Sequence, residues 1–378
     1  METTARRHDI DWLRVIAIGL LLIYHVAIGF QSWGTMIGFI ANKQPWASLW
    51  VPMTMLNVWR IPLLFFVSGM GVNFAIRKRD WKQLLKERAG RILLPFIFGI
   101  FFIVPVHVWI WQKYYHLPTG YAYGPGHLWF LGNIFAYVVI LSPVFFYLKN
   151  HAEGKRARAL KRVLSHPLGL LPVAALFIAE VLIVRPRPFE LYAMTWHGFF
   201  LGLLAFFTGF CFVFSGKPFW EMIFRWKWLF LAAAATLFVV RIVHFQQFAP
   251  NYLISIESNA WVLTVFAFGY RYLNRPGRAL RYLSQAAYPV YIVHMIFLYL
   301  GSLLIFPLPI PVQLQFVLTL VFTLGGCLGV YEFVIRRVGF LRPLFGLRGE
   351  GKAEAEKQSP AVAPSASPYP PDNSSAIF

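Results

Sequence analysis

The sequence predicts an all-α integral membrane protein with about ten transmembrane helices and both termini in the cytoplasm. Of its 378 residues, 58% are hydrophobic and 13% are charged, and the mean hydropathy is +0.59. Soluble globular domains carry about a quarter charged residues, so this content is too low for a water-soluble fold. Apolar stretches long enough to cross a bilayer recur along the chain. Lys and Arg gather in alternate connections between these stretches.

Ten apolar stretches are predicted to span the membrane, and the fifth and eighth are the shortest. They run near 12–32, 48–74, 91–111, 127–148, 168–184, 192–214, 227–245, 259–273, 284–305 and 312–335.

The connections between the spans set the predicted orientation. Segments 77–91, 149–162 and 271–281 are rich in Lys and Arg, as is the segment after the last span. The alternate connections are nearly bare, with Lys43 in the first and Lys113 in the third. Because cytoplasmic loops carry the excess of basic residues, this alternation predicts ten helices with both termini cytoplasmic.

Residues 1–346 are predicted to form one membrane-embedded domain, and residues 347–378 a disordered cytoplasmic tail. The tail is rich in Pro, Ser and Ala and has no apolar period. The first apolar run follows Arg6 and Arg7 and is too long for the core of a cleavable signal peptide. No internal repeat is visible, which gives no support to an inverted-repeat transporter.

The net charge of +20 does not indicate a nucleic-acid partner, because the basic residues lie in short runs between apolar spans. The expected partner of the apolar surface is the lipid bilayer. Cys211 and Cys327 both lie inside apolar segments, so neither a disulfide framework nor a zinc site is expected. We expect no metal and no permanently bound cofactor. Nucleophile elbows, phosphate-binding loops, zinc-protease motifs and dinucleotide fingerprints are absent from the sequence.

The first span contains the clearest candidate pair, Arg14 and His25. Eleven residues return to nearly the same helical face about 16 Å further along the axis. Arg14 is therefore expected near the cytoplasmic surface and His25 near the bilayer centre, in line with each other. This placement suits a ligand with an anionic head and a buried reactive end. Arg14 as an interfacial anchor, and His25 as an interhelical hydrogen-bonding residue, are the alternatives.

Arg88 and Arg91 form a second candidate group at the start of the third span. They lie three residues apart on one helical face, and two guanidiniums so placed can bind phosphates. Ordinary positive-inside topology is the alternative explanation.

The second span contains Asn57 and Arg60. Arg60 is expected near mid-depth, where a charge must face a cavity or a carboxylate. Glu332, near the end of the tenth span, is the carboxylate expected to pair with one of the arginines. Ser68, Gly69 and Gly71 are expected to permit close helix packing rather than chemistry.

The ninth span contains Tyr291 and His294, and His294 is expected at a depth similar to that of His25. His127 opens the fourth span at the opposite membrane face.

Five motifs follow one another along the chain: Asp11-Trp-Leu-Arg14 with His25, Arg60-Ile-Pro-Leu-Leu-Phe-Phe-Val-Ser68-Gly69, Arg88-Ala-Gly-Arg91, His127-Leu-Trp-Phe-Leu, and Tyr288-Pro-Val-Tyr291-Ile-Val-His294. In this order they resemble the acyltransferase family 3 membrane proteins, and most closely the branch that contains the glucan biosynthesis protein C. The resemblance covers residues 6 to about 346.

The resemblance implies an O-acyltransferase that takes an acetyl- or succinyl-type group from cytoplasmic acyl-CoA. The acceptor it implies is a hydroxyl of a glycan or another cell-envelope molecule, and the location is the cytoplasmic (inner) membrane of a bacterium. It assigns catalysis to Arg14 and His25 and donor binding to Arg88 and Arg91. The soluble domain that many relatives carry is absent from the sequence, so transfer is expected to finish within the membrane domain.

Two roles remain open for His25, either general base or transient acyl carrier. Arg60 or His294 is the expected donor to a tetrahedral oxyanion. A secondary transporter or glycan flippase is the alternative function, because transporters also bury charges among many helices. The sequence assigns no oligomeric state.

Overall fold

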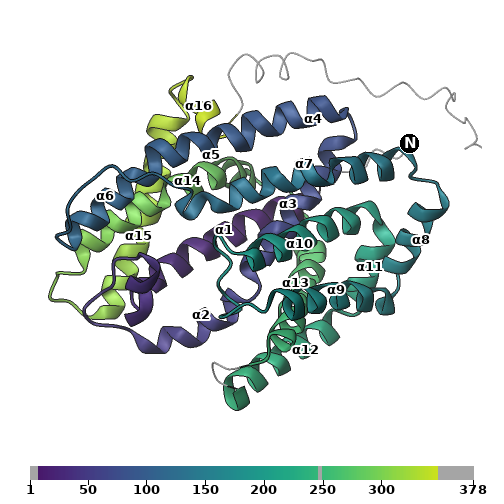
Figure 1. The fold of residues 1–378 in the computed structure, drawn as a ribbon, viewed down its shortest axis with the longest axis horizontal. Helices are drawn as coiled ribbons and strands as arrows, with labels where there is room; N and C mark the ends of the chain where they lie inside the picture. The colour runs from purple at the N-terminus through teal and green to yellow at the C-terminus, as the bar shows by residue number, and fades with distance from the viewer. Residues whose placement is uncertain (1–6, 246–248, 348–378) are drawn as a thin grey trace, which may run out of the picture.

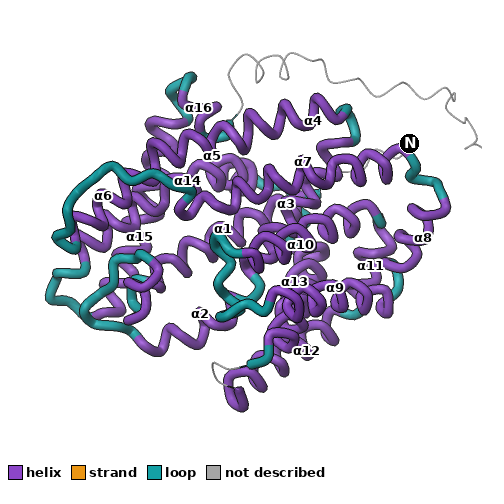
Figure 2. The backbone as a smooth tube through the Cα atoms, in the orientation of Figure 1, coloured by secondary structure: helices purple, strands orange, loops and turns teal. Residues whose placement is uncertain are grey.

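The computed structural model describes residues 7–245 and 249–347, and within these ranges the chain is helical with no strand (Figures 1 and 2). Ten helical stretches of this part of the chain are long and apolar enough to cross a membrane. The predicted all-α membrane fold is therefore confirmed. The orientation of the termini stays a prediction. The predicted tail lies outside the described residues apart from Leu347.

The ten stretches are assembled from α-helices with 3₁₀ and π segments between them. In chain order the elements are α1 (His8–Ile28), η1 (Ser32–Ile37), η2 (Ala47–Leu49), α2 (Trp50–Asn57), α3 (Arg60–Ile76), α4 (Trp81–Arg88), η3 (Ala89–Leu93), α5 (Leu94–Phe98), η4 (Gly99–Ile103), α6 (Val104–Tyr114), η5 (Gly126–Leu128), α7 (Trp129–Asn150), α8 (Lys155–Leu164), η6 (Pro167–Gly169), α9 (Leu170–Val184), α10 (Trp196–Phe214), α11 (Lys217–Arg225), α12 (Lys227–Val240), η7 (Arg241–Phe245), α13 (Asn251–Tyr272), α14 (Arg278–Ile305), α15 (Val312–Val330), η8 (Tyr331–Ile335) and α16 (Leu341–Leu344).

Several spans begin earlier than hydropathy alone predicts. The first begins at His8 rather than 12 and ends at Ile28, and the eighth begins at Asn251 rather than 259. Charge pairing explains the first shift, because the buried Asp9 carboxylate accepts a 2.8 Å hydrogen bond from the Arg7 Nε. A paired carboxylate costs less to bury than a lone one, so the helix extends through a polar start.

The basic connections are not simple loops. Segment 77–91, predicted as a connection, contains α4, which begins with a capping box in which Asp80 and Gln83 bond each other's backbone N–H groups. Segment 149–162 contains most of α8, in which Lys155 and the three Arg side chains are exposed. Helix α8 lies outside the ten spanning stretches, whereas α4 forms the polar start of the third stretch, Trp81–Tyr114.

Helices α3, α10, α13 and α14 form the interior of the bundle, whereas α9, α12 and α15 are mostly exposed and supply the lipid-facing surface. In Figure 1, α1 and α3 cross the middle of the molecule and α12 lies at its edge. Gly69 of α3 faces the backbone of Phe206, and Gly209 of α10 faces the backbone of Phe66. A Cβ at either glycine would collide with the other helix, so the expected packing role of Gly69 is confirmed.

The second span is interrupted, and this interruption positions the site. Residues Val58 and Trp59 form a turn between α2 and α3, and Arg60 is the first residue of α3. Irregular backbone at membrane depth is tolerated where it is covered by protein or lines a cavity. Arg60 therefore lies at a helix start, not within a continuous helix as the sequence predicted.

Candidate active site

A cavity of about 720 Å³ lies at the end of the bundle where α1 finishes. Its wall is formed by the last turns of α1, by α2 and the start of α3, by α6, η5 and α14, and by the connection 185–195. The cavity is rich in aromatic rings and contains few charged groups. This size and composition are typical of small-molecule sites. Rings that line it include Tyr24, Trp50, Trp111, Phe130, Tyr192 and Tyr299.

His25 enters this cavity and bonds directly to His294. The Nδ1 of His25 lies 2.8 Å from the Nε2 of His294, and the Nδ1 of His294 lies 2.6 Å from the carbonyl oxygen of Tyr291. A carbonyl only accepts, so the His294 Nδ1 carries the proton and donates it. The neutral His294 then accepts at Nε2, and His25 donates from Nδ1.

This chain of donors leaves the Nε2 of His25 as the nitrogen with a lone pair. Among the described residues, Nε2 has no hydrogen-bond partner, and His25 lines the cavity. An imidazole fixed at one nitrogen, with the other presented to a cavity, has the arrangement of a general base held by an orienting group. The interhelical hydrogen bond considered as an alternative role for His25 is present, and it occupies only Nδ1.

Two further histidines extend the cluster. The His127 Nε2 donates a 3.0 Å hydrogen bond to the carbonyl of Ile292, and the Tyr291 hydroxyl donates a 2.5 Å bond to the carbonyl of His127. These bonds hold η5 against α14. The ring centroid of His107 lies 5.3 Å from that of His127. No group of three or more His, Cys, Asp or Glu in the described ranges is arranged to hold a metal ion.

Arg60 lies buried in the cavity wall, with 4% of its surface exposed. Its guanidinium carbon is 3.7 Å from the centroid of the Tyr24 ring, and its Nη2 donates a 3.1 Å hydrogen bond to the Asn57 side chain. Arg60 is close enough to His25 to interact with it electrostatically. The expectation that Arg60 faces a cavity is therefore confirmed.

A buried ion pair that the sequence analysis missed joins four segments beside the cavity. Arg241 donates to the Glu257 carboxylate at 2.6 and 2.9 Å and to the carbonyl of Thr54 at 3.1 Å. Its Nη1 also lies 4.0 Å from Glu190. Burial raises the pKa of Glu190 above its ordinary value, and Arg241 offsets part of that increase.

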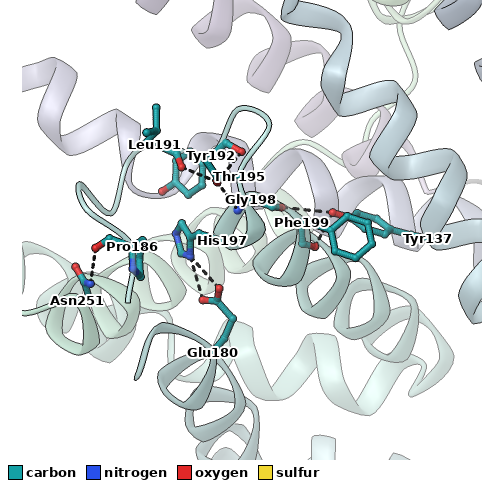
Figure 3. A network of polar contacts seen from close by, with 10 residues as sticks. All are labelled: Tyr137, Glu180, Pro186, Leu191, Tyr192, Thr195, His197, Gly198, Phe199 and Asn251. Atoms are coloured by element: carbon teal, nitrogen blue, oxygen red, sulfur yellow. Dashed lines mark hydrogen bonds and ion pairs between the residues drawn. The ribbon is translucent and has the colours of Figure 1, made fainter. Parts of the chain in front are cut away.

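The connection 185–195 is held in place by polar contacts (Figure 3). The His197 Nδ1 lies 2.9 Å from the Glu180 carboxylate, and both side chains are buried. The Thr195 hydroxyl caps α10 by accepting from the N–H of Gly198, and the Asn251 amide donates to the carbonyl of Pro186. These contacts fix one wall of the cavity.

The predicted donor-binding residues gather near the start of α1. Glu87 lies 3.2 Å from Arg91, 3.7 Å from Arg88 and 3.9 Å from Arg79. Arg14 interacts electrostatically with Arg88 and lies 3.6 Å from Asp11. One carboxylate thus faces three guanidiniums. We call Arg14, Arg79, Arg88 and Arg91 the arginine cluster. Arg91 lies in the π segment η3, and π turns are frequent at functional sites.

The structure does not bring the arginine cluster and His25 together. His25 is in the last turn of α1, about 16 Å along the axis from Arg14, and the cavity begins on α1 at Leu21. From Arg14 to the edge of the cavity at Leu21, about 10 Å of α1 is packed against α3 and α14. Within α1, His25 lies in the last turn rather than near the middle, because the helix begins and ends four residues earlier than predicted. Its depth in the bilayer stays a prediction.

Glu332 does not pair with an arginine of either group. Its carboxylate lies 2.9 Å from Arg336, one turn further along the same chain segment. Glu87 and Glu257 are instead the carboxylates that pair with buried or partly buried arginines. The sequence analysis overlooked both.

The geometry thus combines an oriented imidazole with an open nitrogen and a cluster of arginines suited to an anionic head group. A protein-family model described as an acyltransferase domain matches residues 7–332. The chain belongs to acyltransferase family 3. The protein is therefore an integral membrane acyltransferase, and all the site residues described above lie within the matched range. No curated protein and no solved structure matches the chain.

Proposed function

We propose that this acyltransferase moves an acetyl- or succinyl-type group from cytoplasmic acyl-CoA to a hydroxyl of a glycan or another envelope acceptor. The observation that carries the proposal is the Nε2 of His25, which faces the cavity while Nδ1 is bonded to His294. No other imidazole of the cluster has this arrangement among the described residues: one nitrogen held by a second histidine and the other open.

In the proposed reaction, the His25 Nε2 removes the proton of the acceptor hydroxyl as its oxygen attacks the thioester carbonyl. The tetrahedral intermediate then collapses, the carbon–sulfur bond breaks, and the protonated His25 returns the proton to the departing thiolate. His294 holds the ring and stabilises its protonated form by accepting from Nδ1. The same open nitrogen also suits the second role, attack on the thioester to form a transient acyl-imidazole.

The arginine cluster is the proposed site for the phosphates of the donor. Three guanidiniums around Glu87, with Arg14 beside them, leave an excess of positive charge where a polyanion can bind. The extended arm of acyl-CoA would follow α1 toward His25. Because packed side chains separate Arg14 from Leu21, donor binding must include their displacement.

The aromatic cavity is the proposed site for the acceptor. With both termini cytoplasmic, α1 ends on the extracytoplasmic side, and the cavity lies at that end. Aromatic rings interspersed with Asn57, Arg60 and Glu190 suit a ligand that carries both apolar faces and hydroxyl groups. A bacterial inner membrane is the proposed location.

The proposal is tested with the purified full chain in lipid nanodiscs. Release of the CoA thiol is followed for acetyl-, succinyl- and longer acyl-CoA, with and without glucan oligosaccharides, and the products are identified by mass spectrometry. We expect thioester-dependent O-acylation that is lost in His25→Ala. Thiol release and transfer that are both absent for every donor would refute an acyl-CoA-dependent reaction.

A further inference from the structure

Arg60 is a buried cation that has no counterion among the described residues. It is 4% exposed, and no carboxylate of the described residues lies within 4.0 Å of its guanidinium. Two of its three guanidinium nitrogens, Nε and Nη1, are buried without a hydrogen-bond partner. Removing one partner of a buried ion pair is strongly unfavourable, so an arginine with no built-in partner is expected to receive one from a ligand.

The carboxylates near the cavity are engaged elsewhere. Glu257 accepts both close hydrogen bonds from Arg241, and Glu190 also lies beside Arg241. The polar partners of Arg60 in the described structure, the Asn57 side chain and Tyr24, are both neutral. Within the described ranges, carboxylates therefore neutralise one cavity arginine, Arg241, and leave Arg60 without a counterion.

The surroundings position Arg60 rather than neutralise it. The Tyr24 ring stacks on one face of the guanidinium, and Asn57 holds Nη2. Arg60 is also the first residue of the 17-residue helix α3, whose N-terminal end carries partial positive charge. Side-chain charge and helix dipole therefore add at one point of the cavity wall, as at the interrupted helices that hold anionic groups in membrane transporters.

A permanent anion fits these observations better than a transient oxyanion. An oxyanion exists only during the reaction. With that role alone, the positive charge of Arg60 would have no counterion either in the free protein or in the protein with its substrates bound. A substrate carboxylate compensates the charge throughout binding. A single guanidinium matches the single charge and planar shape of a carboxylate.

We propose that Arg60, positioned by Asn57 and Tyr24, binds a carboxylate carried by one of the two substrates while its reacting group lies at His25. The carboxylate belongs either to the far end of the acyl chain or to the acceptor. The proposal rests on the function proposed above for the choice of substrates, but the binding site itself does not require turnover.

Binding is tested first, by thermal unfolding of the purified full chain in detergent with sodium succinate, sodium glucuronate and their neutral counterparts succinamide and glucose. We expect a carboxylate probe to raise the melting temperature of the wild type and its neutral counterpart to leave it unchanged. Arg60→Gln removes this increase, and Arg60→Lys, which keeps the charge and serves as the second variant if Gln does not fold, reduces it. Arg185→Gln, at an exposed arginine of the connection 185–195, behaves as wild type.

Kinetics then identify the source of the carboxylate. Succinyl-CoA is compared with butyryl-CoA, which has a methyl group in place of the carboxylate, and glucuronate-containing oligosaccharides with neutral ones. For whichever substrate supplies the carboxylate, donor or acceptor, Arg60→Gln raises the KM of the carboxylate-bearing form about 10–100-fold, the range of one charge-assisted hydrogen bond. The KM of the neutral counterpart is unchanged.

Three results would overturn the inference. The first is that neither carboxylate shifts the melting temperature of the wild type. The second is that Arg60→Gln retains the same shift as wild type. The third is a fall in kcat of equal size for all donors without a change in KM, which would identify Arg60 as an oxyanion donor. An inactive wild type that still shows the Arg60-dependent shift would refute the proposed reaction and leave the carboxylate site standing.

Discussion

His25 and His294 are 269 residues apart in the chain, and their imidazoles share a hydrogen bond of 2.8 Å. The bond joins α1 to α14, and the His294 bond to the Tyr291 carbonyl sets its direction. The His294 Nδ1 therefore donates to the backbone, the His25 Nδ1 donates to His294, and the His25 Nε2 is left as a hydrogen-bond acceptor at the cavity. This polarity distinguishes His25 from a histidine that only bridges two helices.

The first prediction concerns His25. His25→Ala and His25→Gln should lower acyl transfer about 10²–10⁴-fold, the usual contribution of a general base, while acyl-CoA still binds. Gln can replace the Nδ1 donor with its amide, but it has no basic nitrogen at the cavity. Transfer is measured in membranes and folding by thermal melting in detergent, with the exposed His151→Gln as control. Near-normal transfer by a folded Gln variant would assign His25 to helix bridging alone.

The second prediction concerns the orienting role of His294. His294→Gln offers a carbonyl oxygen that can accept from the His25 Nδ1, whereas His294→Ala offers nothing. We expect kcat to fall in both variants, less in Gln than in Ala, with KM for the donor unchanged. Equal activity of the Ala variant and wild type would remove His294 from the site.

The third prediction concerns the arginine cluster. Replacement of Arg88 and Arg91 by Ala should raise the KM for acyl-CoA or abolish its binding, while expression and insertion persist. Lys at both positions keeps the charge but loses the planar guanidinium, so partial rescue is expected. The matched control is Lys82→Ala with Lys86→Ala, which removes two exposed charges of α4, the helix that ends at Arg88. If the control and the double Ala variant have the same donor KM, the arginines serve topology only.

The spans and the paired depth of His25 and His294 could be predicted because they depend on local periodicity. Hydropathy locates apolar runs, and fixed helix geometry converts a spacing into a face and a depth. The place of His25 within α1 differs from the prediction because buried Asp9, paired with Arg7, lets the helix begin earlier than its apolar run. Hydropathy counts Asp9 as a solvated charge and cannot register its partner.

The missed residues share a different cause. The Glu257 carboxylate neutralises Arg241 from 16 residues away, and His107 meets His127 only after η5 folds against α14. A single polar residue in an apolar span gives no local sign of its partner. The break before Arg60 also lacks a proline or glycine between 57 and 60, so no turn signal marked it.

The fourth prediction concerns the ion pair between Arg241 and Glu257. Glu257→Leu removes the carboxylate closest to the buried Arg241 guanidinium and leaves Glu190, 4.0 Å from its Nη1, so it should destabilise the fold by about 3–5 kcal/mol. The double variant Arg241→Met, Glu257→Leu removes both charges and should recover most of that loss, because a well-packed apolar pair can replace a buried ion pair. Thermal melting in detergent measures both. A double variant as unstable as the single one would show that the pair has a role beyond mutual neutralisation.

The fifth prediction concerns topology, on which the assignment of donor and acceptor sides depends. The two native cysteines, Cys211 and Cys327, are buried, so a membrane-impermeant maleimide should report chiefly on an introduced thiol. Glu153→Cys, before α8, and Leu308→Cys, between α14 and α15, replace exposed side chains in connections of opposite basic content. In intact cells, Cys at 308 should react and Cys at 153 should react only after the membrane is permeabilised, because basic connections remain cytoplasmic.

Reaction of both sites in intact cells would contradict the ten-span arrangement. Reaction of the 153 site alone would invert it, and the His25 cavity would then open to the cytoplasm with the arginine cluster outside. That outcome is incompatible with a cytoplasmic acyl-CoA donor at Arg88 and Arg91, so this labelling experiment tests the donor site independently of activity.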